Sequence, residues 1–213
     1  MLNGLLLFIL FGFESAPTGR LLSYSIKDNS TITLSGSSNV NSFECTINSN
    51  LTNGYLSVNA DKENGAVNFH NALLKINVSS FDCKNPIMSR DLQKTLRADK
   101  YPLIEAELIT ATPFLVNSKP NASRGKIKTS VAITISGKCR IIDLVVEWQM
   151  ISATEYRFVG SKQLLMSDFD IAAPSAAFGL IKVNNDIVIN FDFTIQTSPS
   201  EKSYQSLSEL LSK

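Results

Sequence analysis

The sequence predicts an all-β, antiparallel protein with one short helix near the middle of the chain and a helical tail. In about nine or ten segments, apolar residues alternate with polar ones at the two-residue period of half-buried strands. Turns rich in Asn, Ser and Gly separate these segments at close intervals, which favours an antiparallel meander over βαβ units. So many strands with one apolar face either pack as a sandwich or close into a barrel, and closure removes the exposed edges.

Length and composition favour one domain. The 213 residues are 44% hydrophobic and 18% charged, which is enough to bury a sizeable core. The formal net charge is +1, and basic and acidic residues are interspersed. Binding to a phosphate backbone needs a basic stripe. Nucleic acid is therefore not an expected partner.

Residues 1–19 are predicted to be a signal peptide, which makes the protein an exported one, periplasmic or extracellular. The apolar run at 2–13 has signal-peptide length and is too short to span a bilayer comfortably. Two features depart from a typical signal peptide. No Lys or Arg precedes the run, and Pro17 comes directly after Ser15 and Ala16, where cleavage would occur. A retained N-terminal anchor or a buried apolar strand are the alternatives.

Three widely spaced cysteines, Cys45, Cys83 and Cys139, indicate one disulfide and one free thiol in an exported protein. Three pairings are open, and Cys45 with Cys83 is the one we favour. A metal site is not predicted, because neither a short Cys-x-x-Cys nor a His-x-x-x-His element accompanies these cysteines and the lone His70.

In the first half of the chain, apolar faces recur in short segments between polar turns. We expect strands around 24–26, 32–36, 43–47, 55–58 and 74–78. An amphipathic helix follows, because Met88, Leu92 and Leu96 recur every four residues between polar ones. Asn85 or Ser89 would cap its start, and Pro102 prevents its continuation past Tyr101.

The second half shows the clearest alternation. Strands are predicted around 104–108, 131–135, 142–150, 156–158 and 187–195. Gly160 is expected where a side chain would have no room. Asp168 and Asp170 would share a face if their segment is a strand, and we interpret them as exposed turn carboxylates rather than a catalytic acid pair.

The tail, residues 198–213, carries signals for a helix. Ser198 would be the cap, Pro199 the first helical residue, and Glu201 the acid three positions after the cap. Tyr204, Leu207 and Leu211 then form an apolar stripe. Such a helix would pack on the outside of the sheet or cover the mouth of a barrel.

The order of these features resembles the YceI-like family of polyisoprenoid-binding, lipocalin-like β-barrels over residues 20–197. Several short segments carry the resemblance: 30–32, 40–43, the helix at 91–96, the Tyr-Pro-x-Ile segment at 101–104, 135–137, 167–169 and the long final strand. Asn41, Cys139 and Asp170 depart from the family's usual residues, and Gly is common at the positions of Asn41 and Asp170.

The resemblance implies an antiparallel barrel with a lid helix that binds an isoprenoid or similar lipid tail without chemistry, for storage or transport. Isoprenoid quinones belong to the ligands that the resemblance implies, and no cofactor is expected. A transient contact with a membrane surface is compatible with this role. The oligomeric state is not specified. The residues expected to line the ligand site are Ile76, Val78, Ile104, Leu108, Ile133, Leu144, Val146, Trp148, Phe158, Phe191 and Phe193.

Two other classes compete with this interpretation. An adhesive or scaffold β domain would have the same alternation around a filled core, because strand periodicity does not distinguish a filled barrel from a hollow one. A hydrolase is not expected, because His70 lies in an alternating segment and the chain has no nucleophile elbow.

Overall fold

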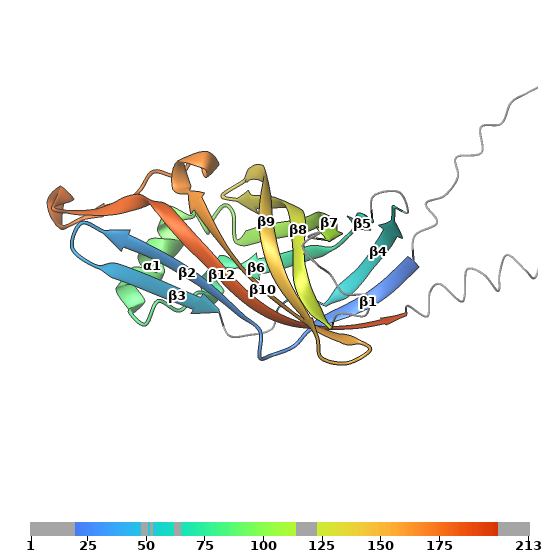
Figure 1. Ribbon diagram of the computed structural model, residues 1–213. Coiled ribbons are helices and arrows are strands. Elements are labelled where there is room, and N and C mark those ends of the chain that lie inside the picture. Colours follow the sequence, from blue (N-terminus) through green and yellow to red (C-terminus); the bar gives the residue numbers. More distant parts are fainter. Residues whose placement is uncertain (1–19, 48–50, 52, 62–64, 114–122, 200–213) are drawn as a thin grey trace, which may run out of the picture.

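The computed structural model describes residues 20–47, 51, 53–61, 65–113 and 123–199 (Figure 1). The predicted signal peptide and nearly all of the predicted helical tail lie outside these residues. The elements, in chain order, are β1 Arg20–Ile26, β2 Thr31–Ser38, β3 Ser42–Ile47, β4 Gly54–Ala60, β5 Val67–His70, β6 Leu73–Asn77, η1 Val78–Ser80, α1 Pro86–Thr95, β7 Leu103–Pro113, β8 Arg124–Ile135, β9 Lys138–Met150, β10 Glu155–Leu165, η2 Met166–Phe169, β11 Ser175–Ala176, η3 Ala177–Gly179 and β12 Ile181–Pro199.

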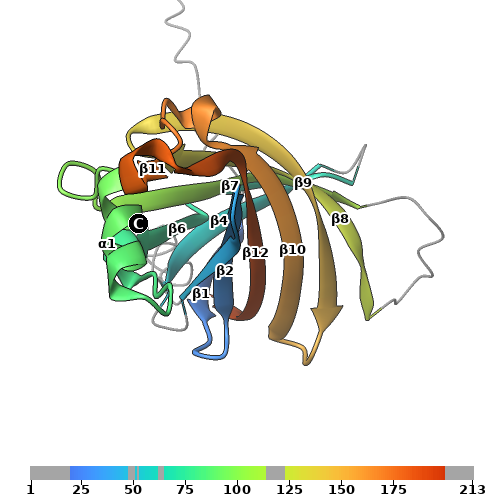
Figure 2. The same ribbon diagram turned by 90° about the vertical axis from the view of Figure 1, so that its left-hand side faces the viewer.

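Eight of the described strands pair into a closed ring, in the order β1, β4, β5, β7, β8, β9, β10 and β12, with β12 returning to β1. All strand pairs among the described residues are antiparallel. Figure 2 looks along the ring, with α1 and β11 beside the end nearest the viewer. The predicted all-β, antiparallel class is therefore confirmed, and a flat sandwich is excluded for this part of the chain.

The long strand β12 organises the ring because three strands use it. One edge pairs with β10, while the other edge pairs with β2 along its first half and with β1 at its end. The switch occurs at Ser30, which is 2% exposed and whose hydroxyl accepts a hydrogen bond from the backbone N–H of Thr194 at 3.0 Å. Thus β1 and β2 act as one strand with a corner at residues 27–30.

Beyond the corner, β2 and β3 extend the sheet without closing it. In the described part of the chain β3 pairs along its length only with β2, and a single bridge joins Thr46 to Asp82. The sheet is thus interrupted between β3 and β6, where the chain enters α1. At this gap the wall depends on contacts other than strand pairing.

The helix α1 begins and ends close to the predicted positions. Asn85 is its cap, since the side-chain oxygen accepts hydrogen bonds from the N–H groups of Ile87 and Met88 at 2.9 and 3.3 Å. The alternative cap, Ser89, instead accepts a hydrogen bond from the N–H of Cys83 at 3.2 Å. The helix ends before Pro102, because Arg97 adopts the left-handed conformation (φ 53°).

Two local predictions were wrong. Val78 is not in a strand, because the side chain of Asn77 accepts the N–H of Ser79 and starts the turn η1. The correction at Val78 follows from side-chain capping by Asn77, which the alternation of apolar residues does not report. The interpretation of Asp168 and Asp170 as exposed turn carboxylates is confirmed, since both are exposed, η2 ends at Phe169 and Asp170 is left-handed (φ 55°).

The start of the predicted tail helix is the second correction. Ser198 and Pro199 are the last residues of β12 and pair with Ser23 and Leu22 of β1. Ser198 is held there by a 2.6 Å hydrogen bond between its hydroxyl and that of Ser23. They cannot therefore act as the cap and first residue of a helix, and the rest of that prediction, residues 200–213, lies outside the described residues.

Candidate functional site

The ring encloses an apolar cavity of about 880 Å³. Its walls are the inward faces of the strands, where apolar side chains fall at every second residue: Ile187, Ile189, Phe191, Phe193 and Ile195 on β12, and Ile104, Ala106 and Leu108 on β7. The wall is completed by Met88 and Leu92 of α1 and by Leu96, which follows the helix. A volume of this size is within the range of roughly 300–1,000 Å³ that is usual for ligand pockets.

The cavity reaches the surface at the end that carries α1. Six of its lining residues are exposed, namely Asn41, Asn85, Ile87, Asp91, Lys94 and Ser175, and all lie on α1, on the β2–β3 turn or on β11. At the opposite end, lining residues such as Leu22, Val58 and Phe158 are at least half-buried. We call these six exposed residues the mouth of the cavity.

Nine of the eleven residues predicted to line the ligand site line this cavity. They are Ile76, Ile104, Leu108, Ile133, Leu144, Val146, Phe158, Phe191 and Phe193. Val78 and Trp148 do not. Val78 belongs to η1 and is packed into the core at 1% exposure, and Trp148 lies over Gly125 of the neighbouring strand, toward the end of β9.

Aromatic rings in the cavity pack over glycines on the adjacent strand. A Cβ atom at Gly160 would lie 2.4 Å from Cζ of Phe191, its cross-strand partner, so the expectation that Gly160 has no room for a side chain is confirmed. The ring of Phe43 covers Gly36 in the same way. Sequence analysis did not select Phe43 as a lining residue, although its alternation with Cys45 and Ile47 was the signal for it.

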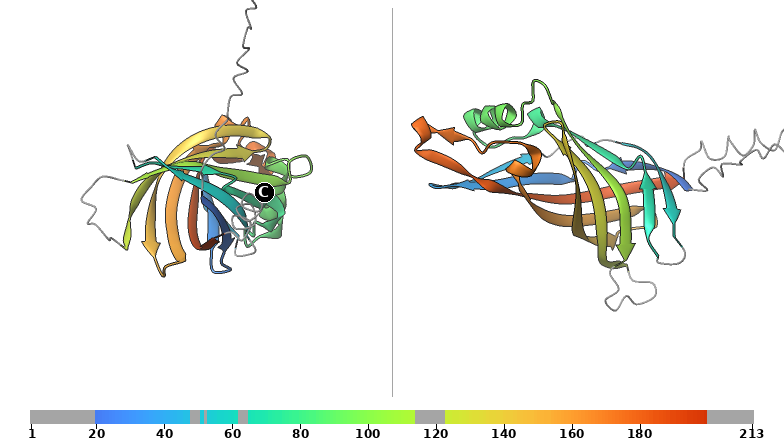
Figure 3. Two further views of the ribbon diagram at one scale, coloured as in Figure 1. Left: turned by 90° about the vertical axis from the view of Figure 1, so that its right-hand side faces the viewer. Right: turned by 90° about the horizontal axis from the view of Figure 1, so that it is seen from above.

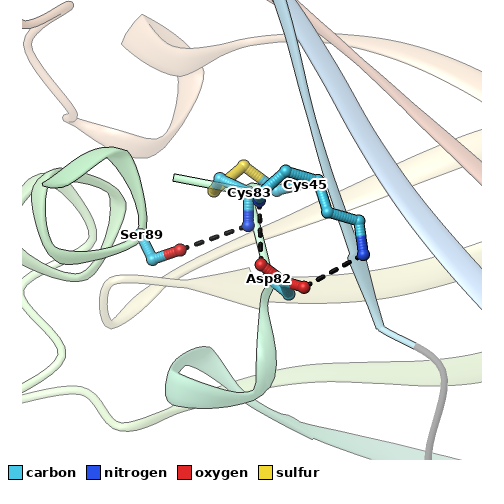
Figure 4. Close-up of polar contacts among 5 residues, drawn as sticks. Cys45, Asp82, Cys83 and Ser89 are labelled. Atoms are coloured by element: carbon cyan, nitrogen blue, oxygen red, sulfur yellow. Dashed lines mark hydrogen bonds and ion pairs between the residues drawn. A yellow bond between two sulfur atoms is a disulfide. The ribbon is translucent and has the colours of Figure 1, made fainter. Parts of the chain in front are cut away.

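A disulfide between Cys45 and Cys83 closes the gap between β3 and the chain that enters α1 (Figure 4). This confirms the favoured pairing, and Cys139 is free and exposed. Beside the bond, Thr46 and Asp82 exchange backbone hydrogen bonds of 2.9 and 3.0 Å. The first turn of α1 is fixed to the same point by Ser89, so the helix is held against β3 by covalent and hydrogen bonds.

The other end of α1 is held by the β8–β9 turn. The hydroxyl of Ser136 donates to the carbonyl oxygen of Leu96 at 2.7 Å, and the Arg97 guanidinium donates to the carbonyl oxygen of Ser136 at 2.9 Å. The ring of Tyr101 packs on Gly137, where a Cβ atom would lie 2.5 Å from Cε1 of the tyrosine. Two segments that carried the family resemblance, 101–104 and 135–137, therefore meet here and hold this end of α1.

Charged groups are largely confined to the outer face of the ring. Lys126 and Glu147 form an ion pair of 2.8 Å across β8 and β9, and Arg157 binds Asp192 across β10 and β12. The side-chain hydrogen bond from Arg157 lowers the pKa of Asp192. Inside, Tyr24 donates to the carbonyl oxygen of Leu73 at 2.8 Å, and burial raises the pKa of its phenol.

Lys162 is the one charged side chain that the described ring strands contribute to the cavity lining. Pairing between β9 and β10 stops at Val146 and Gly160, so Lys162 lies where the two strands separate. Its ammonium donates to the carbonyl oxygen of Asp143 at 2.6 Å, beside a second cavity of about 270 Å³ that shares Leu144 and Lys162 with the first. The stem of Lys162 therefore faces the cavity and its charge lies at the gap.

His70 ends β5 and is exposed, away from the cavity lining. Within the described ranges, no three His, Cys, Asp or Glu side chains are grouped so as to hold a metal ion. In the same part of the chain, no helix has the length and apolar character needed to cross a membrane.

Comparison with known proteins gives similarity in structure alone. No family model matches the chain, and no curated protein matches it. BcnA of Burkholderia cenocepacia superposes with a TM-score of 0.58 at 16% identity, over 80% of this chain and 99% of that one. A polyisoprenoid-binding domain from Saccharophagus degradans, implicated in plant cell wall breakdown, gives 0.59 at 14% identity, over 83% and 99%.

The YceI protein of Campylobacter jejuni also matches, with a TM-score of 0.48 at 18% identity, over 68% of this chain and 80% of that one. The superpositions on BcnA and on the polyisoprenoid-binding domain each cover 99% of the matched protein and at least 80% of this chain. The chain has a YceI-like fold, as its sequence predicted.

Proposed function

We propose that this protein binds the apolar tail of an isoprenoid or similar lipid inside the ring, as a storage or transport protein that performs no chemistry on it. The observation that carries the proposal is the cavity of about 880 Å³, which is apolar along its length and opens at a partly polar mouth. In this proposal the eight-stranded ring is the wall of a lipocalin-like barrel. The similar domain from Saccharophagus degradans is itself named as polyisoprenoid-binding, which supports the same ligand class.

The physical basis is the removal of a hydrocarbon chain from water. Each methylene-sized group that enters an apolar site contributes about 0.8 kcal/mol. Association and ordering of a flexible chain consume a large part of that sum, so the affinity does not follow from the area alone. The mouth residues Asn41, Asn85 and Ser175 offer hydrogen bonds to a polar head group, which would leave the tail in the cavity and the head at the surface.

The proposal includes export to the periplasm or the extracellular space. Its support is the apolar run at 2–13 together with the Cys45–Cys83 disulfide, since disulfides persist mainly in oxidising compartments. The alternative of an adhesive or scaffold domain requires a filled core, and the cavity does not fit that requirement.

A displacement assay tests the proposal. The fluorescent probe N-phenyl-1-naphthylamine gains intensity in an apolar site, so the protein is expected to raise its emission, and the long-chain prenyl alcohol solanesol is expected to lower the emission again in a saturable manner. Geraniol, a short prenyl alcohol, serves as the control and should displace far less, because it buries fewer methylene-sized groups. A protein that leaves the probe dark, or keeps it bound at saturating solanesol, would refute the proposal.

A further inference from the structure

Two turns project beyond α1 at the mouth and are joined to each other. They are the β2–β3 turn and the segment from β11 to the start of β12, seen at the left of Figure 1 and in the right-hand view of Figure 3. The side chain of Asn39 accepts from the N–H of Lys182 at 2.9 Å and donates to the carbonyl oxygen of Leu180 at 2.9 Å. The backbone N–H of Asn39 also donates to the carbonyl oxygen of Lys182 at 3.1 Å. We call this bonded pair of turns the tip.

The tip exposes large apolar side chains. Phe178 is fully exposed, Leu180 is 76% exposed and Val40 is 62% exposed. Ile87, which lines the mouth from α1, is also 62% exposed. Phe178 is presented by a left-handed backbone (φ 53°), a conformation that is uncommon for a large residue. Exposed apolar side chains gathered in one place mark an interaction surface.

The charge of the tip selects the kind of partner. Residues 35–43 contain no charged side chain, and residues 171–183 contain a single one, Lys182, which is exposed. An interfacial segment needs apolar side chains that enter the boundary between head groups and acyl chains, and basic residues strengthen its attraction to anionic lipids. The absence of carboxylates in both sequence segments removes the repulsion that an anionic surface would exert on them.

We propose that the tip docks on an anionic phospholipid bilayer, with Phe178, Leu180 and Val40 inserted among the lipids and Lys182 near the head groups. This inference rests on the proposed function, because the tip borders the mouth and would let an apolar chain move between bilayer and cavity without crossing water. Continuity with the mouth distinguishes a bilayer from a second copy of the chain, whose contact would give the cavity no source of lipid.

Sedimentation with vesicles tests the docking. Vesicles of phosphatidylcholine with phosphatidylglycerol are expected to carry the full-length protein into the pellet, and phosphatidylcholine alone is expected to carry less. The double substitution Phe178→Ser with Leu180→Ser should lower the partition coefficient at least about tenfold, because two large apolar side chains no longer insert. The matched control is Ile141→Ser with Val145→Ser, which removes two exposed apolar residues from the outer face of β9 and should change partitioning little.

The outcomes separate docking from ligand binding. Solanesol displacement by the tip variant should equal that of the wild type, and this result together with lost partitioning supports the proposal. Wild-type protein that stays in the supernatant, or a tip variant that sediments as well as wild type, overturns docking and leaves the cavity proposal in place. A wild-type dimer in light scattering that the tip substitutions dissociate would also overturn it, because a second copy would then be the occupant.

Discussion

Replacing both Cys45 and Cys83 by alanine is expected to lower the free energy of unfolding by about 4 kcal/mol, the stability that a disulfide over a sequence separation of 38 contributes in the chain-entropy model. The bond joins β3 to the segment before α1, where strand pairing is reduced to the single bridge between Thr46 and Asp82. Urea unfolding followed by circular dichroism measures the change. A loss of this size is large against the 5–15 kcal/mol that is typical of whole proteins.

The control is Cys139→Ala, which removes an exposed free thiol and should alter the unfolding free energy by less than about 0.5 kcal/mol. Reducing agent should shift the wild-type midpoint toward that of the double variant and leave the double variant unchanged. If the double variant and the wild type unfold at the same urea concentration, the bond does not hold β3 and α1 together as described.

The substitution Ala106→Trp is expected to weaken solanesol binding by at least about tenfold, because the affinity depends on the number of methylene-sized groups that the cavity accepts. Ala106 is a small lining residue on β7, between Leu74 and Ile133 on the flanking strands. An indole there would project into the middle of the cavity. Since it would occupy empty space rather than packed core, the unfolding free energy should change by less than about 1.5 kcal/mol. Isothermal titration with solanesol gives the affinity.

Ala132→Trp is the matched control. Ala132 lies on β8 between the lining residues Val131 and Ile133, so its side chain belongs to the opposite, outer face of the same sheet. The same indole added there should leave solanesol binding unchanged. Wild-type affinity in the Ala106→Trp protein would mean that the ligand does not pass through the middle of the cavity.

The parts of the fold that follow from local periodicity were accessible from the sequence. The alternation of Ile187, Ile189, Phe191, Phe193 and Ile195 gave the inward face of β12, and the four-residue spacing of Met88, Leu92 and Leu96 gave the inward face of α1. Each pattern reports only a contrast between two faces of one element. For that reason both elements and their apolar faces were predicted correctly.

Ring closure and the open interior are not local properties. Closure depends on pairing between β1 and β12, from opposite ends of the described chain, and alternation alone permits a sandwich as well. Whether facing side chains meet depends on ring size and not on any one strand. Trp148 was assigned to the cavity from its strand parity, yet its position near the end of β9, over Gly125, keeps it out of the lining.

The inward position of Lys162 could have been predicted from the alternation of residues along its strand. It shares strand parity with Phe158 and Leu164, which both line the cavity, so the same alternation that placed them inward placed a lysine inward. The register with β9, which ends at Gly160, is what lets its ammonium leave the cavity and reach Asp143. That register depends on tertiary structure, and the sequence pattern does not contain it.

Native mass spectrometry of the freshly purified full-length protein, before and after incubation with solanesol, tests most directly that the cavity accepts an apolar chain. We expect a one-to-one complex with a folded charge-state distribution after incubation. Before incubation, any lipid that the protein retained during purification should be released from it as a prenyl lipid. Spectra that show only the bare polypeptide mass after incubation, from protein that is folded, would contradict this account.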